Sequence, residues 1–189
     1  MGKRYEMRFA GSGGQGVILA SVIFAEAAVI SGLKTVQSQA YGPEARGGVS
    51  KAETVLSREQ IWYSKVTTPD FLLALTQASL DKYSETLAEN YLIITDSSLT
   101  VPERLDQDRV LSIPILETAK EKVGKAFTAN IVAVGAINKA LRLFEEPVML
   151  EAVKRHIPPG TEEINKTALS AGAELISEET ANTFAQNIG

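Results

Sequence analysis

The stretch Gly11-Ser12-Gly13-Gly14-Gln15-Gly16 decides the fold class that this sequence predicts. Directly before it, residues 5–10 alternate between apolar and polar side chains at period two, which indicates a β-strand. Directly after it, apolar residues recur at helical spacing from Val17 to Val29, and Gly32 stands where such a helix would end. The N-terminus therefore reads as a strand, a glycine turn and a helix.

The next two segments predict a mixed sheet. Residues 34–40 suit a second strand, which completes a β-α-β opening whose strands are normally parallel. Residues 49–56 alternate again and predict a third strand. Because the connection between these two strands is too short for a helix, we expect them to pair in antiparallel fashion.

The rest of the chain alternates compact apolar runs with helical patterns. Strands are expected at residues 71–75, 91–95 and 110–113. Helices are expected at residues 77–88 and 131–144, from Pro147 onward, and at residues 161–176, which would be the last helix. No linker or internal repeat divides the 189 residues. The sequence therefore predicts one α/β domain over residues 1–189, a three-layer α/β/α arrangement with a mixed, mostly parallel sheet.

The amino-acid composition excludes several classes of function. The net charge of −4 gives no electrostatic footprint for nucleic acid, so no nucleic-acid partner is expected. The chain has no cysteine and a single histidine, His156, so it offers neither thiolate ligands for an iron–sulfur cluster nor a multi-histidine metal site. It also lacks a signal-peptide core and any run of about 20 apolar residues. We therefore expect a cytoplasmic protein with no membrane partner and no metal of its own.

The glycine stretch is the first candidate site. Its G-x-G-x-x-G pattern, placed between a strand and a helix, lets the backbone of Gly11, Ser12, Gly13, Gly14, Gln15 and Gly16 approach a phosphate or carboxylate at the helix N-terminus. The alternative is that the glycines only permit a tight turn and close packing of helix on sheet.

The second candidate site follows the second strand, in Tyr41-Gly42-Pro43-Glu44-Ala45-Arg46-Gly47-Gly48. Arg46 can grip an anion with its planar guanidinium, Tyr41 can stack on a flat ring, and Gly47 and Gly48 allow another backbone to come close. Since parallel strands end at one edge of a sheet, we expect both sites to face one crevice. The alternative is an exposed turn with a solvated arginine.

Two rival enzymes can be tested against the residues. A stand-alone NAD dehydrogenase needs a carboxylate at the end of the second strand, and residues 35–40 contain none. An α/β-hydrolase would use Ser12, Asp96 and His156 in that order. However, Ser12 would then follow the first strand, and too few strands precede it to build the α/β-hydrolase fold. We favour turn or anion hydrogen bonds for Ser12, a turn-capping role for Asp96, and a helix C-terminal position for His156.

The two motifs together resemble the gamma subunit of the thiamine diphosphate-dependent 2-oxoacid:ferredoxin oxidoreductases. The resemblance rests on the strand plus Gly11–Gly16, on Gln39-Ala40 followed by the 41–48 motif, and on Asp70 and the helix that begins near Asn130. It covers essentially the whole chain. Within the family, the length and the wording of residues 42–48 look most similar to the separate gamma chain of the 2-oxoglutarate type; pyruvate and branched-chain oxoacids are the alternative substrates.

The resemblance implies a hetero-oligomeric oxidoreductase that decarboxylates a 2-oxoacid with coenzyme A and reduces ferredoxin. Thiamine diphosphate, magnesium and iron–sulfur clusters would lie on alpha and beta subunits, with a delta subunit as a further candidate partner, and none would be held by this chain alone. Gly11–Gly16 would approach the coenzyme A phosphates, while Tyr41, Arg46, Gly47 and Gly48 would line the coenzyme A channel or a subunit interface. No catalytic residue is assigned. A purely structural assembly subunit remains the alternative.

Overall fold

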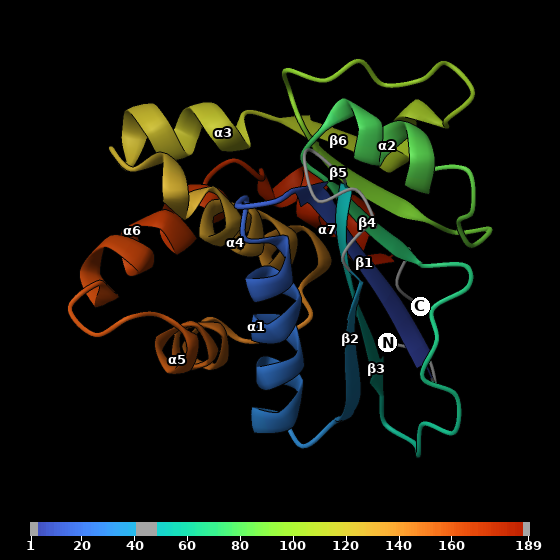
Figure 1. Ribbon diagram of the computed structural model, residues 1–189, viewed down its shortest axis with the longest axis horizontal. Helices are drawn as coiled ribbons and strands as arrows, with labels where there is room; N and C mark the ends of the chain where they lie inside the picture. The colour runs from blue at the N-terminus through green and yellow to red at the C-terminus, as the bar shows by residue number, and fades with distance from the viewer. Residues whose placement is uncertain (1–3, 41–48, 187–189) are drawn as a thin grey trace.

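The computed structural model describes residues 4–40 and 49–186 (Figure 1). A single six-stranded sheet has the order β2-β3-β1-β4-β5-β6. Its strands are β1 (Arg4–Ser12), β2 (Lys34–Ala40), β3 (Val49–Ser57), β4 (Phe71–Ala74), β5 (Leu92–Asp96) and β6 (Val110–Ile113). The pairs β1–β4, β4–β5 and β5–β6 are parallel, whereas β3 is antiparallel to both of its neighbours. The sheet is therefore mixed and mostly parallel, as the sequence predicts.

The first β-α-β unit differs from the sequence expectation in one respect. Strands β1 and β2 run in the same direction but are not neighbours, because β3 folds back between them. Strand β3 pairs with β1 along its whole length, from Arg4 opposite Ser57 to Ser12 opposite Val49. That pairing also draws Gly11 and Ser12 into β1, so the turn proper begins at Gly13.

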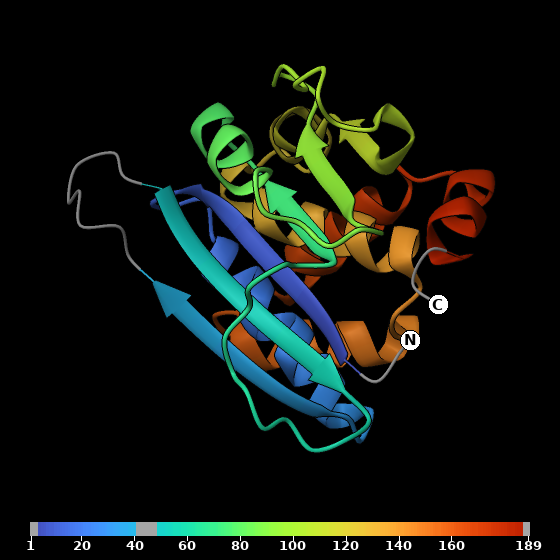
Figure 2. The ribbon, with the colours of Figure 1, turned by 90° about the vertical axis from the view of Figure 1, so that its right-hand side faces the viewer.

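Helices cover both faces of the sheet. One face carries α1 (Val17–Ile30), α4 (Ala129–Leu141) and α5 (Glu146–His156), with α6 (Glu162–Ala173) and α7 (Glu178–Gln186) packed beside α4. The other face carries α2 (Gln77–Tyr83) and long coil segments, one of which crosses in front of β3 in Figure 2. Short helical turns complete the chain: η1 (Gln107–Arg109), α3 (Ile115–Glu117), η2 (Thr118–Lys122) and η3 (Ala126–Thr128).

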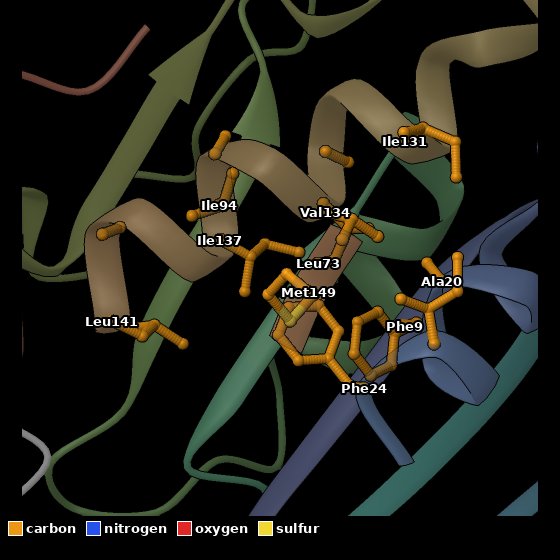
Figure 3. Packing of buried hydrophobic residues seen from close by; sticks show 14 of the residues in the cluster. Phe9, Ala20, Phe24, Leu73, Ile94, Ile131, Val134, Ile137, Leu141 and Met149 are labelled. Atoms are coloured by element: carbon orange, nitrogen blue, oxygen red, sulfur yellow. The ribbon is translucent and has the colours of Figure 1, made fainter. Parts of the chain in front are cut away.

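A hydrophobic core lies on each face. The larger core gathers between the sheet and α1, α4 and α5, where Phe9 from β1 and Phe24 from α1 meet with ring centroids 5.7 Å apart (Figure 3). The smaller core lies under α2 and includes Leu72, Leu80 and Ile93. Two separate cores, one on each side of the sheet, establish the three-layer α/β/α architecture.

Two helices of the larger layer approach unusually closely. Added to Gly135 of α4, a Cβ atom would lie 2.0 Å from the carbonyl oxygen of Leu169, and on Gly172 of α6 it would lie 1.9 Å from that of Val132. Real Cβ atoms essentially never come that near another heavy atom. The small residues of α4 therefore serve packing inside the chain.

Two helix ends and one additional helix differ from the sequence expectation. Helix α2 ends at Tyr83 rather than near residue 88, and α4 ends before Phe144 because Arg142 adopts a left-handed conformation (φ 49°). Helix α6 is not the last one: α7 follows it. Its nine residues bury only Ala181 and Phe184, too few apolar positions to reveal a helical period in the sequence.

Candidate functional site

The glycine turn joins β1 to α1 through left-handed backbone. Gly14 (φ 88°) and Gly16 (φ 70°) lie in the region that side chains rarely adopt. Gly16 is the N-cap of α1, and a Cβ atom there would lie 2.5 Å from Nδ2 of Asn130. Glycine is therefore required at position 16 both by conformation and by space.

Two side chains hold this turn in place, Gln15 from within the turn and Asn130 from α4. The Ser12 amide donates to Oε1 of Gln15 (2.7 Å), and Nε2 of Gln15 donates to the carbonyl of Leu75 (3.2 Å). Nδ2 of Asn130 lies 3.4 Å from the Gly16 carbonyl oxygen. Both ends of the Gln15 side-chain amide are therefore engaged within the chain, and the approach of the Gln15 backbone to a ligand stays a prediction. Sequence reasoning also missed Asn130, which is 114 residues from its partner.

An open hollow of about 420 Å³ lies between the turn and the first two helical turns of α1. Ser12, Gly14, Gly16 and Ser50 form its polar side, and Val17, Ile18, Leu19 and Val22 form its apolar side. Within residues 4–40 and 49–186, no hydrogen bond engages the hydroxyl of Ser12 or Ser50. The positive end of α1 and two available hydroxyls make the polar side suitable for an anionic group, and the apolar side suits an uncharged chain.

The second predicted motif, with Tyr41, Arg46, Gly47 and Gly48, lies outside the described residues. The residues that flank it are described: Ala40 pairs with Lys51, and Val49 pairs with Ser12. Ala40 and Val49, the described residues on either side of the motif, therefore lie toward the edge of the sheet where the glycine turn begins. The roles assigned to the four residues remain predictions.

Neither rival enzyme is assembled by this fold. The insertion of β3 moves the end of β2 one strand away from β1, and β2 itself carries no carboxylate for a dinucleotide ribose. In the hydrolase reading, Asp96 accepts from the amides of Ser98 (3.0 Å) and Leu116 (2.8 Å). His156 lies at the end of α5 against Glu26 of α1, with Nε2 and Oε2 3.3 Å apart. The serine, aspartate and histidine therefore serve separate structures.

The ionisable groups with shifted pKa values lie elsewhere. Burial raises the pKa of the Tyr5 hydroxyl, and burial also raises the pKa of Asp70, whose carboxylate accepts the Glu6 amide (2.7 Å). Both residues lie at the amino ends of their strands, at the edge opposite the glycine turn. None of the described groups with a shifted pKa lines the hollow beside the glycine turn.

The described residues contain neither a metal-binding cluster nor a membrane-spanning helix. Among residues 4–40 and 49–186, no group of three or more histidine, aspartate or glutamate side chains is placed to hold a metal ion. In the same parts of the chain, no helix has the length and apolar character needed to cross a membrane.

Sequence comparison places the chain among oxidoreductases. Residues 6–175 match the family described as pyruvate ferredoxin/flavodoxin oxidoreductase. The 2-oxoglutarate synthase subunit KorC of Methanothermobacter marburgensis is 43% identical, over 93% of this chain and 98% of that protein. The ketoisovalerate oxidoreductase subunit VorA of Methanothermobacter thermautotrophicus is 39% identical over 91% of this chain, which spans only 36% of VorA.

Solved structures show the same fold. The gamma subunit of a keto/oxoacid ferredoxin oxidoreductase from Geobacter sulfurreducens superposes with a TM-score of 0.82 and 42% identity, covering 92% of this chain and 97% of that one. The 2-oxoglutarate:ferredoxin oxidoreductase of Magnetococcus marinus, determined with 2-oxoglutarate, coenzyme A and succinyl-CoA bound, gives a TM-score of 0.79 at 21% identity. That match covers 98% of this chain but 32% of the longer one.

Proposed function

The chain belongs to the pyruvate ferredoxin/flavodoxin oxidoreductase family, and from this premise we propose that it is the gamma subunit of a complex that converts 2-oxoglutarate to succinyl-CoA. The main support for this proposal is the 43% identity to a 2-oxoglutarate synthase subunit over nearly the full length of both chains. The 42% identical Geobacter gamma subunit supports the subunit type. Pyruvate and branched-chain oxoacids are the competing substrates.

The division of labour in the proposed complex follows from what this chain contains. The overall reaction is oxidative decarboxylation of the oxoacid with coenzyme A, giving acyl-CoA, carbon dioxide and reduced ferredoxin. The chain has no cysteine to ligate a cluster, and its hollow presents hydroxyls and backbone rather than acids or bases. Thiamine diphosphate, magnesium and iron–sulfur clusters accordingly belong to alpha and beta subunits, or to a delta subunit.

The glycine turn is the part of the chain best suited to coenzyme A. Backbone at Gly13, Gly14 and Gly16 can approach phosphate closely, and the hydroxyls of Ser12 and Ser50 can donate to it. We assign Gly11 to Gly16 to the coenzyme A phosphates, with Gln15 acting by holding the turn. The uncharged pantetheine arm of coenzyme A suits the apolar side of the hollow. The Magnetococcus oxidoreductase, which contains this fold, binds coenzyme A.

The segment from Tyr41 to Gly48 completes the proposal. Val49, which follows the segment, pairs with Ser12, and on this basis we assign Arg46 to supply a cation to the coenzyme A phosphates, with Tyr41, Gly47 and Gly48 lining the channel. The alternative role for Arg46 is an anchor at a subunit interface, where arginine is favoured. These two roles predict different results for one substitution.

The test uses the assembled complex, with reduction of an artificial electron acceptor as the assay. For Ser12→Ala we expect the KM for coenzyme A to rise about 10- to 100-fold with the KM for 2-oxoglutarate unchanged, because one hydrogen bond to a charged group is lost. Ser31→Ala, at the exposed C-cap of the same helix, is the matched control. For Arg46→Ala, a raised KM for coenzyme A with intact assembly supports the ligand role, and lost assembly supports the interface role.

Three outcomes would contradict the proposal. A complex that forms but whose coenzyme A kinetics ignore both Ser12→Ala and Arg46→Ala would make the chain a structural assembly subunit. An isolated chain that binds NAD would return it to the dehydrogenases. Activity with pyruvate or a branched oxoacid, but not with 2-oxoglutarate, would keep the family and change the substrate.

A further inference from the structure

Helix α1 is apolar on both of its faces. Its inner face is fully buried, with Ile23, Phe24 and Ala27 in the large core. The other residues of α1 are of intermediate or full exposure, although Ile18, Leu19 and Ile30 also pack partly against that core; together they form the outer face of the helix: Ile18, Leu19, Val22, Ala25, Glu26, Val29 and Ile30. Val29 is 57% exposed. A surface helix normally presents charged and polar residues on that side, and a helix that is apolar all round is normally buried.

The one charged residue of this outer face is already matched. Oε1 of Glu26 lies 2.8 Å from Nη1 of Arg155, and its Oε2 lies 3.3 Å from Nε2 of His156, both on α5. The Arg155 hydrogen bond holds the pKa of Glu26 below its ordinary value, with a further contribution from His156. The face therefore combines exposed apolar side chains with a charge that is already paired within the chain.

The surroundings of α1 leave its outer face accessible. In Figure 1 the helix faces the viewer, with α5 along one side and β2 along the other, and no described element lies in front of it. The hollow next to the glycine turn continues onto the same face through Ile18, Leu19 and Val22. Apolar side chains gathered along one accessible side of a helix are typical of an interaction site.

We infer that the outer face of α1 packs against a second polypeptide of the oxidoreductase, the one that corresponds to the remainder of the longer relatives. In VorA the matched region is 36% of the protein, and in the Magnetococcus chain it is 32%. In those proteins the polypeptide outside the matched region makes up about two thirds of the whole chain. When the same domain exists as a separate chain, the surface that contacts the remainder becomes an intermolecular interface.

The chemistry of the face fits such a partner. Permanent interfaces are more apolar than transient ones and resemble a domain core cut in half. The outer face of α1 offers aliphatic side chains, so its counterpart is an apolar surface. Because these side chains stand on a helix, α1 loses little conformational entropy on docking. This inference rests on the proposed function, since it takes its partner from the same complex.

The test is Val29→Lys in the co-expressed complex. Val29 lies in the last turn of α1, where a lysine is compatible with the helix dipole, so the isolated chain should keep its melting temperature. A charge without a partner inside an apolar interface should weaken association about 100-fold or more, measured by co-purification and titration of the partner. Val29 is also about 18 Å along the helix from the glycine turn, which separates docking from coenzyme A binding.

A second pair of variants guards against an effect of charge alone. Ala25→Asp tests the middle of the same face, and Asn182→Asp places the same charge on the exposed side of α7. We expect Ala25→Asp to abolish co-purification and Asn182→Asp to leave it unchanged.

The outcomes separate this inference from the proposed function. If the wild-type chain captures no subunit of a 2-oxoacid oxidoreductase, the proposed function fails. If the wild type captures one and Val29→Lys and Ala25→Asp bind it equally well, the docking inference is overturned while the proposed function stands. If sedimentation instead shows a dimer of the isolated chain that Val29→Lys dissociates without affecting the partner, the face belongs to a second copy.

Discussion

The outer face of α1 and the outer faces of α6 and α7 meet solvent with opposite chemistry. Helix α6 exposes Glu162, Glu163 and Lys166, and α7 exposes Glu178 and Glu179. Ion pairs of Lys122 with Glu174, and of Lys139 and Arg142 with Glu178, link these helices to their neighbours across the surface. Helix α1 exposes aliphatic side chains instead.

The difference shows which helices of this chain need no partner to cover their outer faces. The C-terminal helices have buried inner faces and hydrated outer faces, which is the arrangement of a helix that ends at water. Helix α1 has a core on one side and a second apolar surface on the other. The N-terminal half therefore provides both the proposed ligand site and the proposed docking surface, while the C-terminal helices support the larger core.

The largest effect should distinguish the two faces of α1. Ile23 is fully buried, so Ile23→Ala in the isolated chain should lower the free energy of unfolding by about 2 to 5 kcal/mol through lost burial and a cavity. Val29→Ala should change it by less than about 0.5 kcal/mol, because the side chain is already in water. Urea denaturation measures both. Equal losses would mean that Val29 already supports the fold of the isolated chain.

A smaller effect should come from the crossing of α4 and α6. Gly172→Ala should destabilise the chain by about 1 to 3 kcal/mol, because the new Cβ meets the Val132 carbonyl. This result would run against the helix propensity of alanine, which exceeds that of glycine by about 1 kcal/mol. Ser170→Ala, exposed on the same helix, is the control and should be neutral or slightly stabilising. A stable Gly172→Ala variant would contradict the close crossing.

The smallest effect concerns the contact between α1 and α5. Glu26→Gln should cost on the order of 0.5 kcal/mol at pH 7, because the ion pair is partly exposed to solvent. Since the pKa of Glu26 is lowered in the folded state, its contribution is present above the ordinary carboxyl value of about 4.3 and is lost as the pH falls through the lowered value. Thermal unfolding between pH 7 and pH 3 should show the wild type and Glu26→Gln converging, with Glu163→Gln as the exposed control. A constant difference would assign the effect to packing.

The sequence predicted the elements whose signals are local. Strands β2 and β6 have the bounds that were expected, and Pro147 lies in the first turn of α5. Gly32 ends α1 as expected: its amide donates to the Val29 carbonyl, and that of Leu33 donates to the Ala28 carbonyl. Helix α7 escaped prediction because its two buried residues make no recognisable period.

In the candidate site, too, the sequence predicted the local feature but not the contacts that depend on the tertiary fold. The glycine pattern predicted a turn with left-handed backbone at the start of a helix, because only glycine adopts that conformation without strain. The roles of Gln15 and Asn130 did not follow from the pattern, since their partners, Leu75 and Gly16, are brought near by the folded sheet. The roles proposed for Tyr41, Arg46, Gly47 and Gly48 still rest on the sequence.

By itself, the sequence determined the α/β class, the glycine turn and the absence of thiolate ligands, because each of these follows from residue type and short-range spacing; the family was indicated by the resemblance of its two motifs to known proteins. Only the tertiary structure decided that β3 separates β1 from β2, that the small residues of α4 pack against α6, and that one apolar side of α1 is left outside the core. The physical reason is that periodicity records how apolar a helix is, whereas the elements packed around it determine which of its faces is covered.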